Sequence, residues 1–405
     1  MKSVVILFAV IVAAISCKKP YDPPAIRGPN GYLVVEGVIN SGTDSTFITL
    51  SRTVNLDSIS FKPELQAILT VQGDNNNSYP LIELGKGRYG CAGLNLDNSH
   101  QYHLSIKTAN GEAYQSAFLP VLNSPPIDSV SFDTKGALAV PGVNLYVTTH
   151  DPTGKILYYR WEFNETWIFH SNFPSDFYSN GDTVLGRNQL TQNITDCWGN
   201  DTSSSILLGS SAKLSRDIIY KAPLTSVVST SEKLEDEYSI LVTQYALTPD
   251  AFTFYTNLKQ NTESLGSIFD PEPSQINGNI TCTTNPTEPV IGYISVGSTS
   301  TLRTFIANTQ LPRWQTIPYY TNCKLEFDWN AMPPQICCYF VDQNGNNEVN
   351  EYINYNIGGN PNPFIPIDPI LEFGNHGPVI GYTASTRQCV DCTLRGSNKK
   401  PAFWP

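Results

Sequence analysis

The chain has 405 residues, of which 40% are hydrophobic and 15% charged, and a formal net charge of −11 at pH 7. The hydrophobic share excludes a disordered chain, and the negative charge disfavours nucleic-acid binding because the phosphates would be repelled. Its 29 Pro, 28 Gly, 21 Tyr and 18 Phe residues are typical of many short strands joined by turns.

Residues 1–16 have the pattern of a secretion signal. Lys2 is followed by an apolar run that is shorter than the roughly 20 residues a membrane-spanning helix needs. Ser16 and Cys17 then follow, in an arrangement that resembles the bacterial lipobox. We expect cleavage before Cys17 and acylation of this cysteine, which would attach the protein to a lipid bilayer. The alternative is an ordinary secreted protein that is cleaved nearby.

Residues 17–31 include four prolines. Proline-rich chain is stiff and rises about 3.1 Å per residue, so this segment predicts an extended tether of roughly 40 Å. We expect the tether to hold the folded part of the protein away from the bilayer.

Residues 32–121 predict a first β-sandwich. Short apolar runs follow one another here, and turns that contain Gly and Asn separate them. Between Tyr102 and Lys107 apolar and polar residues alternate, so we expect one face of that strand to be buried and the other exposed. Six or seven strands in about 90 residues indicate a small sandwich.

Residues 126–311 predict a second sandwich, Ig-like or transthyretin-like, after a Pro-containing linker. Tyr159, Trp161 and Phe163 share one face of a predicted strand. A Trp on an early central strand is typical of an immunoglobulin-like core, so we expect Trp161 to be a core residue.

A helix is predicted near 249–264. Thr248 is a favourable N-cap, and Pro249 suits the first helical position. Asp250 complements the helix dipole. We expect the apolar side of this helix to pack on the second sandwich.

Residues 170–211 predict a long insertion in the second sandwich. The stretch is polar and rich in Asn and Gly, and loops beyond about 15 residues are uncommon unless they are functional or disordered. We expect its aromatic residues to contact a protein partner, because such side chains are enriched at the centres of interfaces. The alternative is that they cover the second sandwich. These partner-contact candidates are Phe173, Phe177, Tyr178 and Trp198.

Residues 312–405 predict an irregular segment that disulfides hold in place. Apart from Cys17 the chain has eight cysteines, and an even number in an exported protein favours disulfides, although their pairing cannot be deduced from sequence. A zinc site that uses the Cys389-x-x-Cys392 pair is the alternative. The disulfide candidates are Cys91, Cys197, Cys282, Cys323, Cys337, Cys338, Cys389 and Cys392.

A short run near residue 345 has the alternating oxygen side chains of a calcium loop. Its glycine stands at the wrong position for an EF-hand, so a solvated turn is the favoured interpretation. The motifs GxSxG and HExxH and a phosphate-binding glycine loop are absent from the sequence. We therefore predict no enzyme, no catalytic residues and no cofactor. The calcium candidates are Asp342, Asn344, Asn346 and Glu348.

Several segments together resemble one protein family. They are the early LVVEGVIN strand, the PPIDSVSF and EPVIGYISVGS segments, and the terminal CVDCTLRGSNKKPAFW. With the lipobox, they are similar to the Bacteroidota lipoproteins known as domain of unknown function 4249. The resemblance implies an outer-membrane lipoprotein that assists a TonB-dependent receptor, and it implies no catalytic residues.

The function we expect is therefore an accessory or substrate-capturing subunit of a TonB-dependent transporter, anchored in the outer membrane, with a nutrient as its possible ligand. A structural subunit of an outer-membrane assembly or secretion complex is the alternative. An enzyme acting on surface polymers is a third hypothesis, which a pair of carboxylates facing a cleft would favour.

Overall fold

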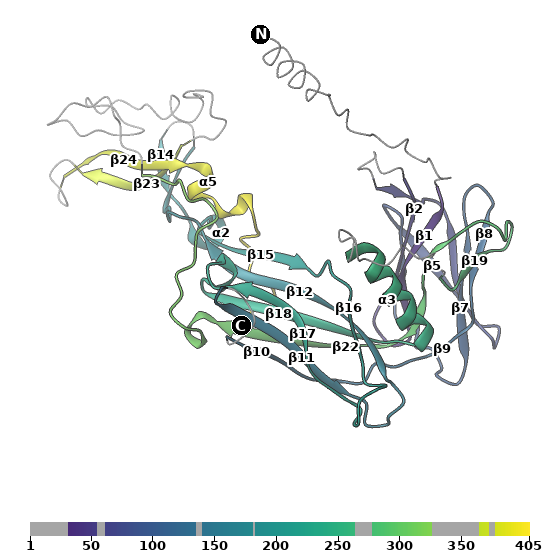
Figure 1. Cartoon of the computed structure of the whole chain (residues 1–405). Helices are drawn as coiled ribbons and strands as arrows, with labels where there is room; N and C mark the ends of the chain where they lie inside the picture. The colour runs from purple at the N-terminus through teal and green to yellow at the C-terminus, as the bar shows by residue number, and fades with distance from the viewer. Residues whose placement is uncertain are drawn as a thin grey trace, which may run out of the picture.

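A computed structural model describes residues 31–54, 61–134, 140–180, 183–263, 278–325, 364–371 and 377–405. Strands dominate these residues, so the predicted mostly-β fold class is confirmed. Figure 1 shows one β unit at one end, a second β unit beside it, and the β23–β24 hairpin at the far end of the second unit. Helix α3 (Pro249–Glu263) lies between the two β units.

The first unit is a sheet of twelve described strands in the order β19-β8-β7-β4-β5-β6-β2-β1-β20, with β3, β9 and β21 at its sides. The sheet folds over so that its two halves enclose one core, which includes Leu33, Ile48, Leu69, Tyr102 and Ile106. The strands are β1 (Leu33–Asn40), β2 (Thr46–Arg52), β3 (Lys62–Pro63), β4 (Ile68–Gly73), β5 (Ser78–Gly85), β6 (Arg88–Cys91), β7 (Gln101–Lys107), β8 (Ala113–Ser116), β9 (Leu119–Pro120), β19 (Ile280–Cys282), β20 (Ile291–Gly292) and β21 (Ser295–Gly297).

The second unit has two facing sheets. One is β10-β11-β17, and the other is β15-β12-β18-β22 with β16 also paired to β12. Trp161 is 1% exposed within their common core, so its predicted core position is confirmed. The strands are β10 (Ile127–Asp133), β11 (Gly142–His150), β12 (Tyr158–His170), β15 (Asp196–Thr202), β16 (Leu207–Ser210), β17 (Ile218–Val228), β18 (Glu237–Ala246) and β22 (Thr299–Ala307).

A smaller third group of elements joins the 170–211 region to the C-terminal region. The hairpins β13–β14 and β23–β24 lie side by side, with β13 against β23. These elements are β13 (Phe177–Ser179), β14 (Val184–Gly186), β23 (Phe364–Leu371) and β24 (Val379–Thr386). The remaining short turns are α2 (Gln189–Gln192), η1 (Glu232–Leu234), η2 (Asn308–Gln310), α5 (Arg387–Val390) and η5 (Cys392–Leu394).

Two sequence-based boundaries are wrong. We expected 126–311 to belong to the second sandwich throughout, but β19, β20 and β21 return to the first sheet, where β20 and β21 pair in parallel with β1. Parallel pairing requires a long crossover connection, and a local hydrophobic pattern does not reveal which distant strand is the neighbour. We also expected 170–211 to be an insertion, but β15 and β16 pair with β12 as members of the five-stranded sheet.

Candidate functional site

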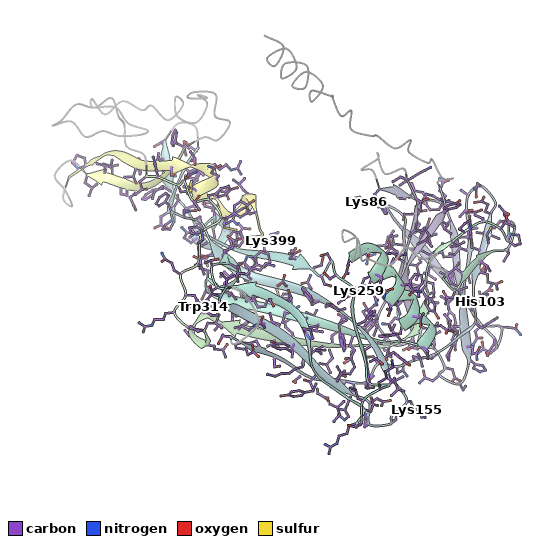
Figure 2. All side chains as sticks on the ribbon, in the orientation of Figure 1. Lys86, His103, Lys155, Lys259, Trp314 and Lys399 are labelled. Atoms are coloured by element: carbon purple, nitrogen blue, oxygen red, sulfur yellow. A yellow bond between two sulfur atoms is a disulfide. The ribbon has the colours of Figure 1, made fainter. Side chains whose placement is uncertain are left out.

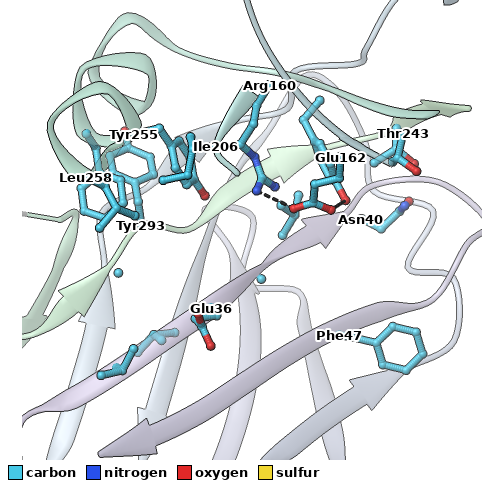
Figure 3. Close-up of a pocket in the computed structure, with 18 of the residues that line it drawn as sticks. Glu36, Asn40, Phe47, Arg160, Glu162, Ile206, Thr243, Tyr255, Leu258 and Tyr293 are labelled. Carbon is cyan, nitrogen blue, oxygen red and sulfur yellow. Dashed lines mark hydrogen bonds and ion pairs between the residues drawn. The ribbon is translucent and has the colours of Figure 1, made fainter. Parts of the chain in front are cut away.

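A cavity of about 870 Å³ lies where the two β units and α3 meet. Its floor is the outward face of β1, and its walls are β12, β18, the segment before β16, and α3 (Figure 3). Ligand pockets in proteins typically have volumes of roughly 300–1,000 Å³ and lie preferentially between domains. The size and place of this cavity make it the candidate site.

The floor follows from the alternation of side chains along β1. Leu33 and Val35 point into the core and are almost fully buried, so Val34, Glu36 and Val38 point the other way and line the cavity. Gly292 of β20 completes the floor with φ of 135°, and an added Cβ there would overlap the carbonyl oxygen of Val35. Only glycine therefore allows β20 to lie this close to β1.

The opposite wall follows from the same alternation on β12. Trp161 points into the core, where its Nε1–H donates to Gln244 Oε1 at 2.8 Å. Arg160 and Glu162 therefore point outward and line the cavity. Across the sheet, Arg160 pairs with Tyr245 of β18, which lines the cavity too.

Arg160 is the centre of a cluster of polar and aromatic groups. Its Nη1 lies 2.6 Å from Glu162 Oε1, and its guanidinium carbon lies 4.3 Å from the ring centroid of Tyr245 and 4.8 Å from that of Tyr255. Burial lowers the pKa of Arg160, but Tyr255, Glu162 and Tyr245 outweigh this and keep it above its ordinary value. The other oxygen of Glu162 accepts a hydrogen bond from the Tyr245 hydroxyl at 2.8 Å. Arg160 Nε is buried and has no hydrogen-bond partner among the described residues.

Helix α3 closes the cavity on one side. The Thr248 hydroxyl accepts a hydrogen bond from the Ala251 N–H at 3.1 Å, so it caps the helix as the sequence predicts. Ala251 and Phe254 are buried against Leu247 and Tyr293. The helix therefore packs on residues near both β units, and not on the second sandwich alone as expected. Lys259, which Figure 2 labels on α3, anchors the last turns of the helix by donating to the Ile206 carbonyl at 2.7 Å.

The two segments that connect the β units, residues 122–124 and 296–298, lie against each other beside the cavity and are called the chain crossings below. The Leu122 N–H donates to the Val296 carbonyl at 2.9 Å, and the Ser124 N–H donates to the Ser298 carbonyl at 3.2 Å. An added Cβ at Gly297 would overlap the Leu122 carbonyl oxygen, so the two crossings touch backbone to backbone. Such a junction leaves the cavity preformed, which reduces the ordering cost of binding.

Two disulfides are formed among the cysteines that the sequence analysis named. Cys197 pairs with Cys392, and Cys323 pairs with Cys389. The prediction that Cys91 and Cys282 form disulfides is wrong, because both are free. These two lie in the first β unit, whereas the bonded cysteines lie on β15 and in the segments after β22. Cys337 and Cys338 lie outside the described residues.

The partner-contact candidates do not form an open surface. Phe173 packs beside buried Ile367, Cys389 and Val390. Phe177 lies 5.3 Å, centroid to centroid, from Tyr382 of β24. The C-terminal segment therefore packs against Phe173 and Phe177, a contact that the sequence analysis did not predict.

Trp198 and Tyr178 also have neighbours within the chain. Trp198 is on β15, and its ring centroid lies 6.3 Å from that of Trp404 near the C-terminus. Tyr178 is partly exposed on the β13–β14 hairpin, with the Arg187 guanidinium 5.8 Å from its ring centroid. All four candidates are partly buried.

The acylation and calcium sites that the sequence predicts are not among the described residues. Cys17 and the calcium candidates Asp342, Asn344, Asn346 and Glu348 lie outside the described residues. The described part of the chain contains no group of three or more His, Cys, Asp or Glu residues arranged to hold a metal ion. It also contains no helix that is long and apolar enough to span a membrane.

Sequence reasoning did not identify the cavity. The strand around Trp161 was the one part of the sequence that could have pointed to the cavity, because a core position for Trp161 places Arg160 and Glu162 on the opposite face of the strand. Nothing in the sequence indicated that this face meets Glu36 of β1.

Comparison with known proteins agrees with the resemblance found in the sequence. The family model described as Domain of unknown function (DUF4249) matches residues 18–303. A search of curated proteins found no match. The matched range includes the first β unit, α3, the second β unit up to residue 303 and every described residue that lines the cavity. On this match, the chain belongs to the DUF4249 family.

Proposed function

We propose that the protein is an outer-membrane lipoprotein that captures a small ligand for a TonB-dependent receptor. The observation that carries the proposal is the cavity of about 870 Å³ between the two β units. It has the size of a small-molecule site, and its walls combine aromatic, aliphatic and charged side chains as such sites do.

The architecture around the cavity supports capture rather than catalysis. Glu162 is bonded to both Arg160 and Tyr245, so it is positioned as part of a fixed wall. Hydrogen bonds and backbone contacts between the chain crossings hold the floor and the walls in place. A rigid cavity binds without a large ordering cost.

Anchoring rests on the sequence around Cys17. Acyl chains on this cysteine would keep the cavity close to a receptor in the same membrane, so that a weak contact suffices. We expect Cys17→Ala to release the protein from the membrane pellet and to remove the lipid mass from the N-terminal peptide. Unchanged pelleting without lipid on that peptide would contradict the anchor.

Ligand capture is tested by native mass spectrometry of protein purified from its own membranes. We expect a small molecule to accompany the protein and to be lost from Val38→Trp, because the indole would fill space above the floor. Val228→Trp is the matched control, since Val228 is 41% exposed on β17 and does not line the cavity. Retention of the same molecule by a folded Val38→Trp variant would rule out this cavity as the site.

Receptor association is tested by co-purification of the tagged, acylated protein after mild crosslinking. We expect a TonB-dependent receptor among the crosslinked proteins. Enrichment of an assembly or secretion complex in its place, together with an empty cavity, would support the alternative of a structural subunit.

A further inference from the structure

The charges around the cavity identify the class of ligand, an inference that rests on the proposed function. Four of the described lining residues are acidic, Glu36, Asp44, Glu162 and Glu263, whereas one described lining residue, Arg160, is basic. The chain as a whole has a net charge of −11. A cleft lined mainly by one sign of charge concentrates counter-ions of the opposite sign.

The single guanidinium does not balance these carboxylates. Arg160 is paired with Glu162 at 2.6 Å, and tyrosine rings lie near its guanidinium. No described residue forms an ion pair with Glu36 or Asp44. Glu263 forms an ion pair with Lys259, whose Nζ lies 3.8 Å from its carboxylate, so Glu36 and Asp44 are the two lining carboxylates that no described cation pairs with. The cavity therefore keeps an excess of negative charge.

Glu36 is the carboxylate best placed to bind a ligand. Its side chain is exposed on β1, and Figure 3 shows it on the opposite side of the cavity from Tyr255, Leu258 and Tyr293. Burial raises the pKa of Tyr255 and Arg160 opposes this rise, while the charges of Glu162 and Glu36 add to it. The negative charge of Glu36 on the floor therefore acts on Tyr255 of α3, on the opposite side of the cavity.

The surroundings of Glu36 are apolar as well as acidic. Val34 and Val38 flank it on β1, and Ile291, Leu258 and the ring of Tyr293 complete the lining around it. A small cation such as a metal ion gains nothing from these groups, whereas an aliphatic or aromatic chain is favoured by them. The absence of a metal-ligand cluster among the described residues agrees with this distinction.

We propose that the captured ligand is an organic cation, with an amine or guanidinium group that binds Glu36 and an apolar portion that packs against α3. The Arg160–Glu162 pair then serves as a neutral, fixed wall. Asp44 and Glu263 attract the cation toward the cavity without contacting it.

Three dansyl probes with the same linker test the charge preference. Dansylcadaverine ends in an amine, its N-acetyl derivative is neutral, and dansyl-6-aminohexanoic acid ends in a carboxylate. Dansyl fluorescence increases when the probe enters an apolar site, so a titration of the purified protein gives each Kd. We expect dansylcadaverine to bind at least about tenfold more tightly than the neutral probe, with a preference that weakens as salt is raised.

Glu36→Gln assigns the preference to one residue. We expect this variant to lose about tenfold in affinity for dansylcadaverine and to bind the neutral probe as the wild type does. Glu237→Gln is the matched control, because it removes the same charge at the end of β18 away from the cavity. Equal urea midpoints of the two variants confirm that both are folded.

The outcomes separate this inference from the proposed function. Equal binding of the amine and neutral probes, or tighter binding of the carboxylate probe, overturns the cationic class and leaves capture intact if Val38→Trp abolishes binding. A preference for the amine that Glu36→Gln does not reduce overturns the role of Glu36. Binding of none of the three probes overturns both the ligand class and capture in this cavity.

Discussion

Replacement of Cys197 and Cys392 by Ala removes the covalent link between β15 and the C-terminal segment. The two cysteines are 195 residues apart in the chain. In the chain-entropy model a loop of that length contributes about 5 kcal/mol to stability, while measured disulfides typically contribute roughly 2 to 4 kcal/mol. We therefore expect the double variant to lose about 3 kcal/mol in the free energy of unfolding of the second unit with its C-terminal segment.

Several noncovalent contacts remain in that variant. Arg395 Nη1 lies 2.8 and 2.9 Å from the two carboxylate oxygens of Glu232. Trp198 and Ser397 exchange two backbone hydrogen bonds of 2.8 and 3.0 Å. Because these contacts hold the same segment, we expect the variant to fold in water and to release the C-terminal segment at a lower urea concentration than the wild type.

Tryptophan fluorescence follows this change, because the described tryptophans all lie outside the first unit. They are Trp161, Trp167, Trp198, Trp314 and Trp404. Limited proteolysis at each urea concentration reports when the C-terminal segment becomes accessible. Cys91→Ala is the matched control, since Cys91 is free and lies in the first unit. The reasoning is refuted if the double variant and the control unfold at the same urea concentration.

Three further perturbations test the energetics of the fold. In the wild type the Glu165 carboxylate is 6% exposed and lies 2.6 Å from Lys233 Nζ, so Lys233→Met leaves it without its cation. We expect the free energy of unfolding in urea to fall by about 3 kcal/mol. If adding Glu165→Gln to this variant does not recover most of the loss, the reason given is wrong. Gly297→Ala forces apart the two chain crossings, and we expect it to cost roughly 1 to 3 kcal/mol, whereas Gly186→Ala, in open space, should be neutral in the same thermal melts. Burial raises the pKa of Asp151, but hydrogen bonds from residues 153–156 outweigh this and hold it at about 2. Because that value lies below the unfolded pKa near 3.8, Asp151 contributes up to about 2 kcal/mol to the free energy of unfolding at neutral pH. This contribution should vanish as pH falls from 3.8 toward 2. An Asp151→Asn variant whose stability in urea depends on acid pH as the wild type's does would argue against this.

Local patterns in the sequence predicted the elements that local physics controls. Apolar and polar residues alternate along the strand that became β7, and burial follows that alternation except at His103, which is buried beside Phe118. The N-terminal signals of α3 were also sufficient, because the cap at Thr248 depends only on neighbouring residues. The core position of Trp161 followed from the same kind of local pattern.

The candidate site was only half accessible to such reasoning. Placing Trp161 in the core put Arg160 and Glu162 on the outer face of β12, but the sequence did not say what that face meets. Glu36 is more than 120 positions earlier in the chain. Only the packing of α3 and the parallel pairing of β20 with β1 brings these residues around one cavity.

The sequence by itself determined that the protein is rich in strands, that one helix begins at Pro249, and that the chain has enough cysteines for disulfides. The tertiary structure alone decided that Cys197 pairs with Cys392, that β19 to β21 return to the first sheet, and that Phe173 and Phe177 face the C-terminal segment. The physical reason is the range of the interactions. Side-chain alternation and helix capping act within a few residues, whereas these pairings join segments far apart in the chain, and many alternative partners satisfy the same local pattern.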